Sequence, residues 1–349
     1  MRPTEFLKIK REIQFDGLRG IAALIVLNSH FVCAFLPSLN SKFFPEIFNS
    51  DESNLFNSFF QTPPLSLIFN GHAAVCIFFV LSGYVLSIPF HQGRVNKLYS
   101  RLYARYLRLN IPIFFVTLFS FFLSKLNLYK NSLAGDLSGS QWMMYWYQSS
   151  KMSFSEMIKS SFFKGIFYGD DNFIAPLWTL KIEFIGSLLL IIYLIISFGK
   201  KQIYTLPIFL IFLTIFFKNE YIYYYLFIAG CFLKFFPVFK GFSFNLILFL
   251  GFYLISFQDS SFYKFFTYLP FNISPMIFCH GLGSLTLVYC IKNGFMFKIL
   301  TSRFCLFFGH ISYSIYLTHH LFLCSFISLF YLSTTQYPFS IYLLYYKYF

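Results

Sequence analysis

Two ionisable side chains, Arg19 and His30, lie in the first long apolar stretch of the sequence. Ionisable residues are costly inside a membrane, so each one marks a candidate functional site. In a helix, His30 would lie about 16 Å beyond Arg19 and point to nearly the same face. Asp16, three positions before Arg19, is placed to form an ion pair with it. A histidine at this depth suits the role of a base that takes a proton from a hydroxyl group. The alternative for His30 is a structural histidine hydrogen-bonded to a neighbouring helix.

Two further groups could act in the same reaction. Glu183 lies near the start of a later apolar stretch, where its carboxylate could orient His30 or bind the hydroxyl groups of an acceptor. His319 lies within the last long apolar stretch and is the second candidate imidazole. The remaining histidines are interpreted as structural or interfacial; they are His72, His91, His280, His310 and His320.

Three arginines, Arg101, Arg105 and Arg108, are spaced four and three residues apart. Residues at this spacing share one face of a helix. Guanidinium groups that converge in this way bind phosphate groups well. The alternative is that these arginines serve only to anchor the protein on the cytoplasmic side of a membrane.

The composition identifies the environment in which these groups act. Apolar residues make up 57% of the 349 positions and charged residues only 11%, and the mean hydropathy is positive. A soluble domain of this length would need more charge, so the sequence predicts an integral membrane protein. The net charge of +14 comes from basic residues in short segments between apolar stretches, which is the positive-inside pattern and not a nucleic-acid-binding stripe. The seven cysteines show no CxxC or metal-ligand spacing and are interpreted as buried thiols, and no metal site is predicted.

The apolar stretches predict an all-α membrane protein with about ten transmembrane helices in one bundle. The first stretch is long enough to span and is interpreted as a retained helix and not a signal peptide. Most of the 27 lysines and arginines, including every arginine, fall on one side if both termini are cytoplasmic. We therefore expect a single domain, residues 1–349, with no appended soluble domain. The predicted spans are 17–36, 66–88, 109–126, 177–198, 203–217, 220–236, 243–257, 271–291, 306–331 and a short tenth, 337–349.

The longest segment expected on the extracytoplasmic side, 127–176, contains an aromatic cluster formed by Trp142, Tyr145, Trp146 and Tyr147. Such a cluster is typical either of the aromatic belt at a membrane surface or of a platform on which a glycan stacks. The sequence leaves both interpretations open.

Five motifs that follow one another along residues 15–320 resemble the acyltransferase-3 family of membrane-bound O-acyltransferases. No single motif is specific for this family, but the occurrence of all five in the family's order is. Thr318 departs from the pattern, because the family usually has Trp there. The first motif is residues 15–23, which contain Arg19 and are followed by His30. The others are residues 78–84 with Ser82-Gly83-Tyr84, the three arginines before Pro112, residues 177–183 ending in Glu183, and residues 309–319 ending in His319.

The resemblance implies an O-acetyltransferase of the inner membrane of a bacterium. Acetyl-coenzyme A would be the donor substrate, bound by Arg101, Arg105 and Arg108, with no bound cofactor. The acceptor would be a hydroxyl of a surface polysaccharide or of its lipid-linked precursor, such as lipopolysaccharide O-antigen. The expected partners are acyl-CoA, this carbohydrate and membrane lipids. The alternative functions are a transporter or flippase, or a polymerase, for a lipid-linked glycan. A transporter would more often show an internal repeat, and the sequence shows none.

Overall fold

The computed structural model describes residues 12–48, 55–147, 152–198, 202–218, 220–268 and 273–336, and within these ranges the chain forms helices and no β-strand. Six helical segments are long and apolar enough to cross a membrane. The last segment contains α14 (Arg303–Phe322), a π-helical turn (Leu323–Ile327) and α15 (Ser328–Gln336). The other five are α1 (Gln14–Phe35), α3 (Gly71–His91), α4 (Asn96–Lys125), α8 (Leu177–Ser197) and α12 (Pro275–Lys292).

Three predicted spans are helices of only 10–17 residues, shorter than the approximately 20 residues that usually cross a bilayer. They correspond to α9 (Gln202–Phe216), α10 (Tyr221–Phe232) and α11 (Gly241–Ile255). The predicted tenth span, 337–349, lies outside the described residues. A membrane-type helical bundle is therefore confirmed, whereas the count of about ten and the cytoplasmic position of both termini stay predictions.

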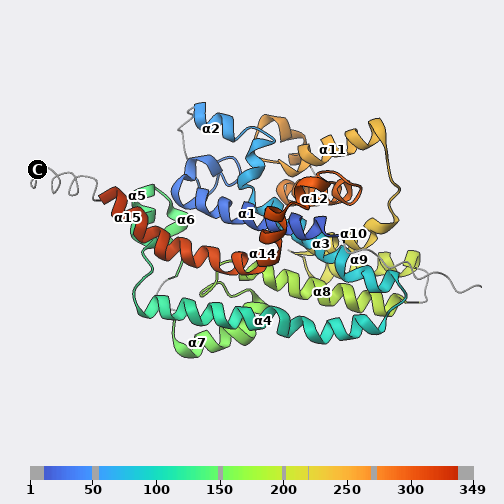
Figure 1. Ribbon diagram of the computed structural model, residues 1–349, viewed down its shortest axis with the longest axis horizontal. Coiled ribbons are helices and arrows are strands. Elements are labelled where there is room, and N and C mark those ends of the chain that lie inside the picture. Colours follow the sequence, from blue (N-terminus) through green and yellow to red (C-terminus); the bar gives the residue numbers. More distant parts are fainter. Residues whose placement is uncertain are drawn as a thin grey trace, which may run out of the picture.

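The centre of the bundle is formed by α1, α3 and α14, with α4 and α8 on one side and α11 and α12 on the other (Figure 1). Helices α1 and α14 touch through glycine: a Cβ atom on Gly20 would lie 2.6 Å from the backbone nitrogen of Gly309. Ten residues further along both helices, His30 contacts His319. The two helices therefore run parallel in one register. If all six long segments cross the membrane, at least one of the shorter helices between α1 and α14 must cross it too.

Helix α4 differs most from its predicted span, because it begins at Asn96 and not near 109. The three arginines are thus part of the same helix as the apolar segment, and Pro112 lies within it. The ends of the central helices follow simple capping rules. The side chain of Asn70 accepts a hydrogen bond from Ala73 N at the start of α3, and Ser302 does the same for Cys305 N at the start of α14.

The predicted outer segment 127–176 is largely helical in its described part. It contains α5 (Asn131–Ser138), α6 (Gln141–Met144), α7 (Phe154–Lys159) and a π-helical segment (Ser160–Tyr168). Three ring contacts show that residues 154–168 run antiparallel to α4 instead of projecting from the bundle. They pair Phe154 with Phe121, Phe162 with Phe114 and Phe167 with Tyr106.

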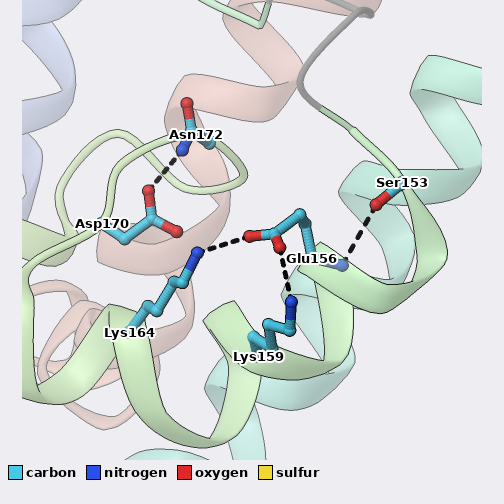
Figure 2. Close-up of polar contacts among 6 residues, drawn as sticks. All are labelled: Ser153, Glu156, Lys159, Lys164, Asp170 and Asn172. Carbon is cyan, nitrogen blue, oxygen red and sulfur yellow. Dashed lines mark hydrogen bonds and ion pairs between the residues drawn. The ribbon is translucent and has the colours of Figure 1, made fainter.

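Polar contacts connect α7 to the π-helical segment that follows it (Figure 2). The carboxylate of Glu156 accepts hydrogen bonds from Lys159 Nζ at 2.9 Å and from Lys164 Nζ at 2.6 Å. These ammonium groups lower the pKa of Glu156, and Glu156 raises the pKa of Lys164. The backbone nitrogen of Glu156 is bonded to Ser153 Oγ, which caps α7. Because solvent screens these exposed pairs, they fix the path of the segment more than they stabilise the fold.

Candidate active site

Four of the predicted charged residues, Arg19, Arg105, Arg108 and Glu183, line a cavity of about 260 Å³ in the centre of the bundle. Five helices contribute to its wall: α1, α3, α4, α8 and α14. The wall contains residues from each of the motifs described above, which lie far apart in the sequence. Its polar side chains are Arg19, Ser82, Arg105, Arg108, Thr179, Glu183, His310, Ser312, Tyr313 and Tyr316.

Glu183 organises one side of this cavity. Its Oε1 atom accepts a hydrogen bond from Ser82 Oγ at 2.7 Å and forms an ion pair with Arg105. Arg105 also donates from Nε to Ser187 Oγ at 3.0 Å, so its guanidinium group is held in place. The hydrogen-bond partners of Glu183 therefore lie in the arginine-lined cavity and do not include His30, which the sequence analysis had suggested it could orient. The second carboxylate oxygen, Oε2, is buried with no hydrogen-bond partner among the described residues.

The predicted arginine cluster is divided by the structure. Arg105 and Arg108 line the cavity, whereas Arg101 does not. Arg101 Nη1 donates to the carbonyl oxygens of Val85 and Leu86, at 2.9 and 3.3 Å. Pro89 lies inside α3 and has no N–H with which to satisfy the carbonyl of Val85, four residues earlier. Arg101 therefore contacts an orphaned carbonyl of α3 instead of the cavity.

Arg19 is the third arginine in the wall of the cavity, beside Arg105 and Arg108. Its Nη1 atom lies 3.7 Å from the carboxylate of Asp16, which confirms the predicted i, i+3 pair. Three guanidinium groups and one carboxylate, that of Glu183, thus line the cavity. No ion pair joins Arg108 to a carboxylate of the described residues. This excess of positive charge favours an anionic ligand, and arginine in particular favours phosphate oxygens.

His30 and His319 form a direct pair. His30 Nδ1 lies 2.7 Å from His319 Nε2, and the two rings are stacked with centroids 4.9 Å apart. His319 Nδ1 lies 3.0 Å from the carbonyl oxygen of Ile315, one turn earlier on α14. A carbonyl only accepts, so His319 Nδ1 carries the proton, and in a neutral ring Nε2 is then the acceptor. His30 Nδ1 must therefore donate to His319. The remaining nitrogen of neutral His30, Nε2, keeps its lone pair and can act as a base.

A short contact connects this histidine pair to the cavity. Tyr316, which lines the cavity, lies one turn before His319 on α14, and its ring centroid is 6.0 Å from that of His319. The hydroxyl groups of Tyr316 and Thr179 are 2.5 Å apart. Thr179 Oγ1 donates to the carbonyl of Pro176 at 2.7 Å, so Tyr316 is the donor to Thr179. The phenol ring is thus fixed between the arginine-lined cavity and the histidine pair.

The aromatic cluster of the segment 127–176 packs against the other side of the histidines. The ring centroid of Trp142 lies 5.4 Å from that of His30, and the centroid of Trp146 lies 5.0 Å from that of His320. His320 Nδ1 lies 3.0 Å from the hydroxyl oxygen of Tyr147. The cluster therefore reaches the interior of the bundle, beyond what an aromatic belt at the membrane surface requires.

Several residues around the site were missed or differently interpreted from sequence. His310 lines the cavity and His320 contacts His30, although both were interpreted as structural or interfacial. Thr179, Ser312 and Tyr316 were not predicted as site residues, but they lie within the motifs, which was the available signal. His72 and His280 form a separate buried network with Asn70 and Tyr223. Among the described residues, no three His, Cys, Asp or Glu side chains are grouped as metal ligands.

Comparisons with known proteins identify the type of enzyme. A family model described as an acyltransferase domain matches residues 12–346. An O-acetyltransferase of Phomopsis amygdali, PaAT-1, is 27% identical over 238 residues, which cover 61% of this chain and 46% of that protein. The chain thus matches about half the length of this relative. No solved structure matches.

Proposed function

The chain belongs to the acyltransferase-3 family, and on this premise we propose that it moves an acetyl group from coenzyme A to a hydroxyl group of a carbohydrate. One observation carries the proposal. The histidine pair, in which His30 Nε2 is left as the base, is connected through Tyr316 to a cavity lined by three arginines. The O-acetyltransferase relative from Phomopsis amygdali supports acetyl as the transferred group.

The arginine-lined cavity is the proposed donor site. Coenzyme A carries phosphate groups, and Arg19, Arg105 and Arg108 provide guanidinium groups for them. Arg105 is held by Glu183 and Ser187, whereas Arg108 has no carboxylate partner among the described residues and is available to the ligand. With the phosphates held at these arginines, the thioester would lie towards Tyr316 and the histidine pair.

The reaction follows from the protonation states of the histidines. His30 Nε2 takes the proton of the acceptor hydroxyl as the hydroxyl oxygen attacks the thioester carbonyl carbon. A carbon–oxygen bond forms, the tetrahedral intermediate collapses, and the carbon–sulfur bond breaks. The thiolate of coenzyme A leaves and takes up the proton from His30. His319 accepts a hydrogen bond from His30 Nδ1 throughout and so holds the ring in the productive orientation.

The acceptor is proposed to be a surface polysaccharide or its lipid-linked precursor, such as lipopolysaccharide O-antigen, and the location a bacterial inner membrane. The aromatic residues beside His30 and His320 support a sugar, because aromatic faces bind the apolar face of a pyranose ring. The six long apolar segments support a multi-pass position in the membrane.

The proposal is tested by analysis of the surface glycan of cells with and without this chain. Mass spectrometry and NMR should find ester-linked acetyl groups that disappear when the gene is deleted and return when it is restored. Identical acetylation in both strains would contradict the proposal.

A further inference from the structure

A second cavity, of about 660 Å³, lies near the end of α4 and the start of α5. Aromatic rings of Tyr129, Trp146 and Tyr147 form part of its wall. Hydroxyl and amide groups, including those of Ser132 and Asn131, form most of the remainder. Lys130 provides the one cation, and no carboxylate lines the cavity. The reaction steps described above involve none of these residues, although Trp146 is one of the aromatic residues that support a sugar as the acceptor.

The wall of this second cavity is held in place by specific contacts. Tyr129 and Tyr147 are stacked, with ring centroids 4.4 Å apart and an interplanar angle of 12°. The hydroxyl oxygen of Tyr129 lies 2.8 Å from Ser120 Oγ on α4. Asn131 Nδ2 donates to the carbonyl oxygens of Met143 and Trp146, both at 2.9 Å. The aromatic wall is therefore formed before any ligand binds, which lowers the entropic cost of binding.

Two buried ring nitrogens beside this cavity lack a hydrogen-bond partner in the described part of the chain. Trp146 Nε1 and His320 Nε2 are buried, and neither has a hydrogen-bond partner among the described residues. An indole N–H is a donor only, and leaving it unpaired costs free energy. Trp146 contributes its ring to the cavity wall, whereas its Nε1 atom is shielded from the accessible space.

The second cavity and the arginine-lined cavity lie on opposite sides of the histidines along α14. Tyr316, one turn before His319, lines the arginine-lined cavity. On the other side, Tyr147 contacts His320, and the carbonyl of Cys324 accepts a hydrogen bond from the backbone of Lys130 at 3.1 Å. A ligand in the second cavity would thus be separated from His30 only by the rings of Trp142, Trp146 and His320.

We infer that the second cavity is the acceptor site and holds a sugar ring of the carbohydrate substrate. The inference rests on the proposed function. A sugar has apolar C–H faces and a rim of hydroxyl groups, which match aromatic rings bordered by neutral hydrogen-bonding groups. Because Lys130 carries a positive charge, the cavity can also bind an acidic sugar. Bound there, the sugar is held on the side of the histidines opposite the donor, and its reacting hydroxyl group must pass the rings of Trp142, Trp146 and His320 to reach His30.

Site-directed labelling tests this placement, because all seven natural cysteines are buried and a new exposed cysteine reacts selectively. Ser132→Cys places a thiol in the cavity wall, and Asp136→Cys places one on the next turn of α5, outside the wall. Both positions are exposed. Each purified variant is treated with a bulky maleimide. Labelled acetyl-CoA is then supplied with methyl glycosides of a hexose, an N-acetylhexosamine and a hexuronic acid.

Modified Ser132→Cys should transfer acetyl to the glycosides about tenfold more slowly or worse, while its hydrolysis of acetyl-CoA in the absence of sugar is unchanged. Modified Asp136→Cys should retain both activities. Equal transfer by the two modified variants would overturn the placement of the acceptor. Hydrolysis of acetyl-CoA by the unmodified protein without transfer to any glycoside would overturn the assignment of a sugar. Absence of both reactions would instead count against the proposed function.

Discussion

His30 Nδ1 lies 2.7 Å from His319 Nε2, and the two histidines are each ten residues beyond the glycines through which α1 and α14 touch. The contact between Gly20 and Gly309 therefore sets the register in which the imidazoles meet. Because the Ile315 carbonyl fixes the proton on His319 Nδ1, this register also determines which nitrogen of His30 is basic. Helix packing and acid–base chemistry are thus linked in this pair.

The glycine contact should be intolerant of substitution. In Gly309→Ala, the new Cβ atom would overlap the backbone of Asp16, which cannot move away without shifting α1. We expect a loss of about 1–3 kcal/mol in stability, as for other overpacked cores, and a loss of acetyl transfer. Thermal unfolding in detergent and activity are measured together. Gly281→Ala is the control, because its nearest neighbour is the flexible end of Leu226 at 3.1 Å. An unchanged melting temperature in Gly309→Ala would show that α1 and α14 do not pack as described.

The arginines should differ in their effect on donor binding. Removal of Arg108 deletes a cavity cation, and a lost charge-assisted hydrogen bond corresponds to a rise in KM for acetyl-CoA of about tenfold or more. Arg101→Ala should leave this KM close to that of the parent, because Arg101 contacts carbonyl groups of α3. Steady-state kinetics at varied acetyl-CoA concentration measures both. Equal effects of the two substitutions would mean that the cluster acts as a whole or only as a topology anchor.

The orientation of the chain is a separate prediction, motivated by the distribution of lysine and arginine. Reporter insertions after Gly93 and Arg303 should be cytoplasmic, and an insertion after Asp136 should be extracytoplasmic. The reverse pattern would place the arginine-lined cavity on the wrong side for a cytoplasmic donor.

His319 should act as a positioning residue. Replacing it with Leu removes the acceptor for His30 Nδ1, and we expect kcat to fall by about two orders of magnitude with little change in KM for acetyl-CoA. His319→Gln should retain part of the activity, because its amide oxygen can accept the same hydrogen bond. If Gln and Leu lower kcat equally, His319 has a role other than orienting His30.

Part of this site could be predicted from the sequence. The spacing of Arg19 and His30 was sufficient to place both on one face of α1, and the motif that ends in His319 identified the second imidazole. What the sequence could not provide was the register between α1 and α14, because it depends on a backbone contact between residues nearly 300 positions apart. The sequence also could not show that Glu183 pairs with Arg105 and not with His30, because this contact depends on how α4 and α8 pack.

The position of Arg101 was, in contrast, open to prediction. Helical spacing placed it on the same face as Arg105 and Arg108, but the orphaned carbonyl created by Pro89 binds its guanidinium group. A proline inside an apolar helix is visible in the sequence and indicates that some donor must satisfy the freed carbonyl. Short helices such as α9, α10 and α11 were harder to judge, because apolar composition does not fix how far a helix extends.

The measurement that tests the account most directly is acetyl transfer by His30→Gln in membranes normalised for the amount of protein. Gln keeps a hydrogen-bonding side chain but cannot accept a proton near neutral pH. We predict normal insertion, unchanged binding of acetyl-CoA and a loss of transfer of about two orders of magnitude or more. His91→Ala should retain transfer, because the imidazole of His91 is bonded to the carbonyl of Cys231 and does not line the cavity. Substantial transfer by His30→Gln would contradict the assignment of His30 as the base and direct attention to His319.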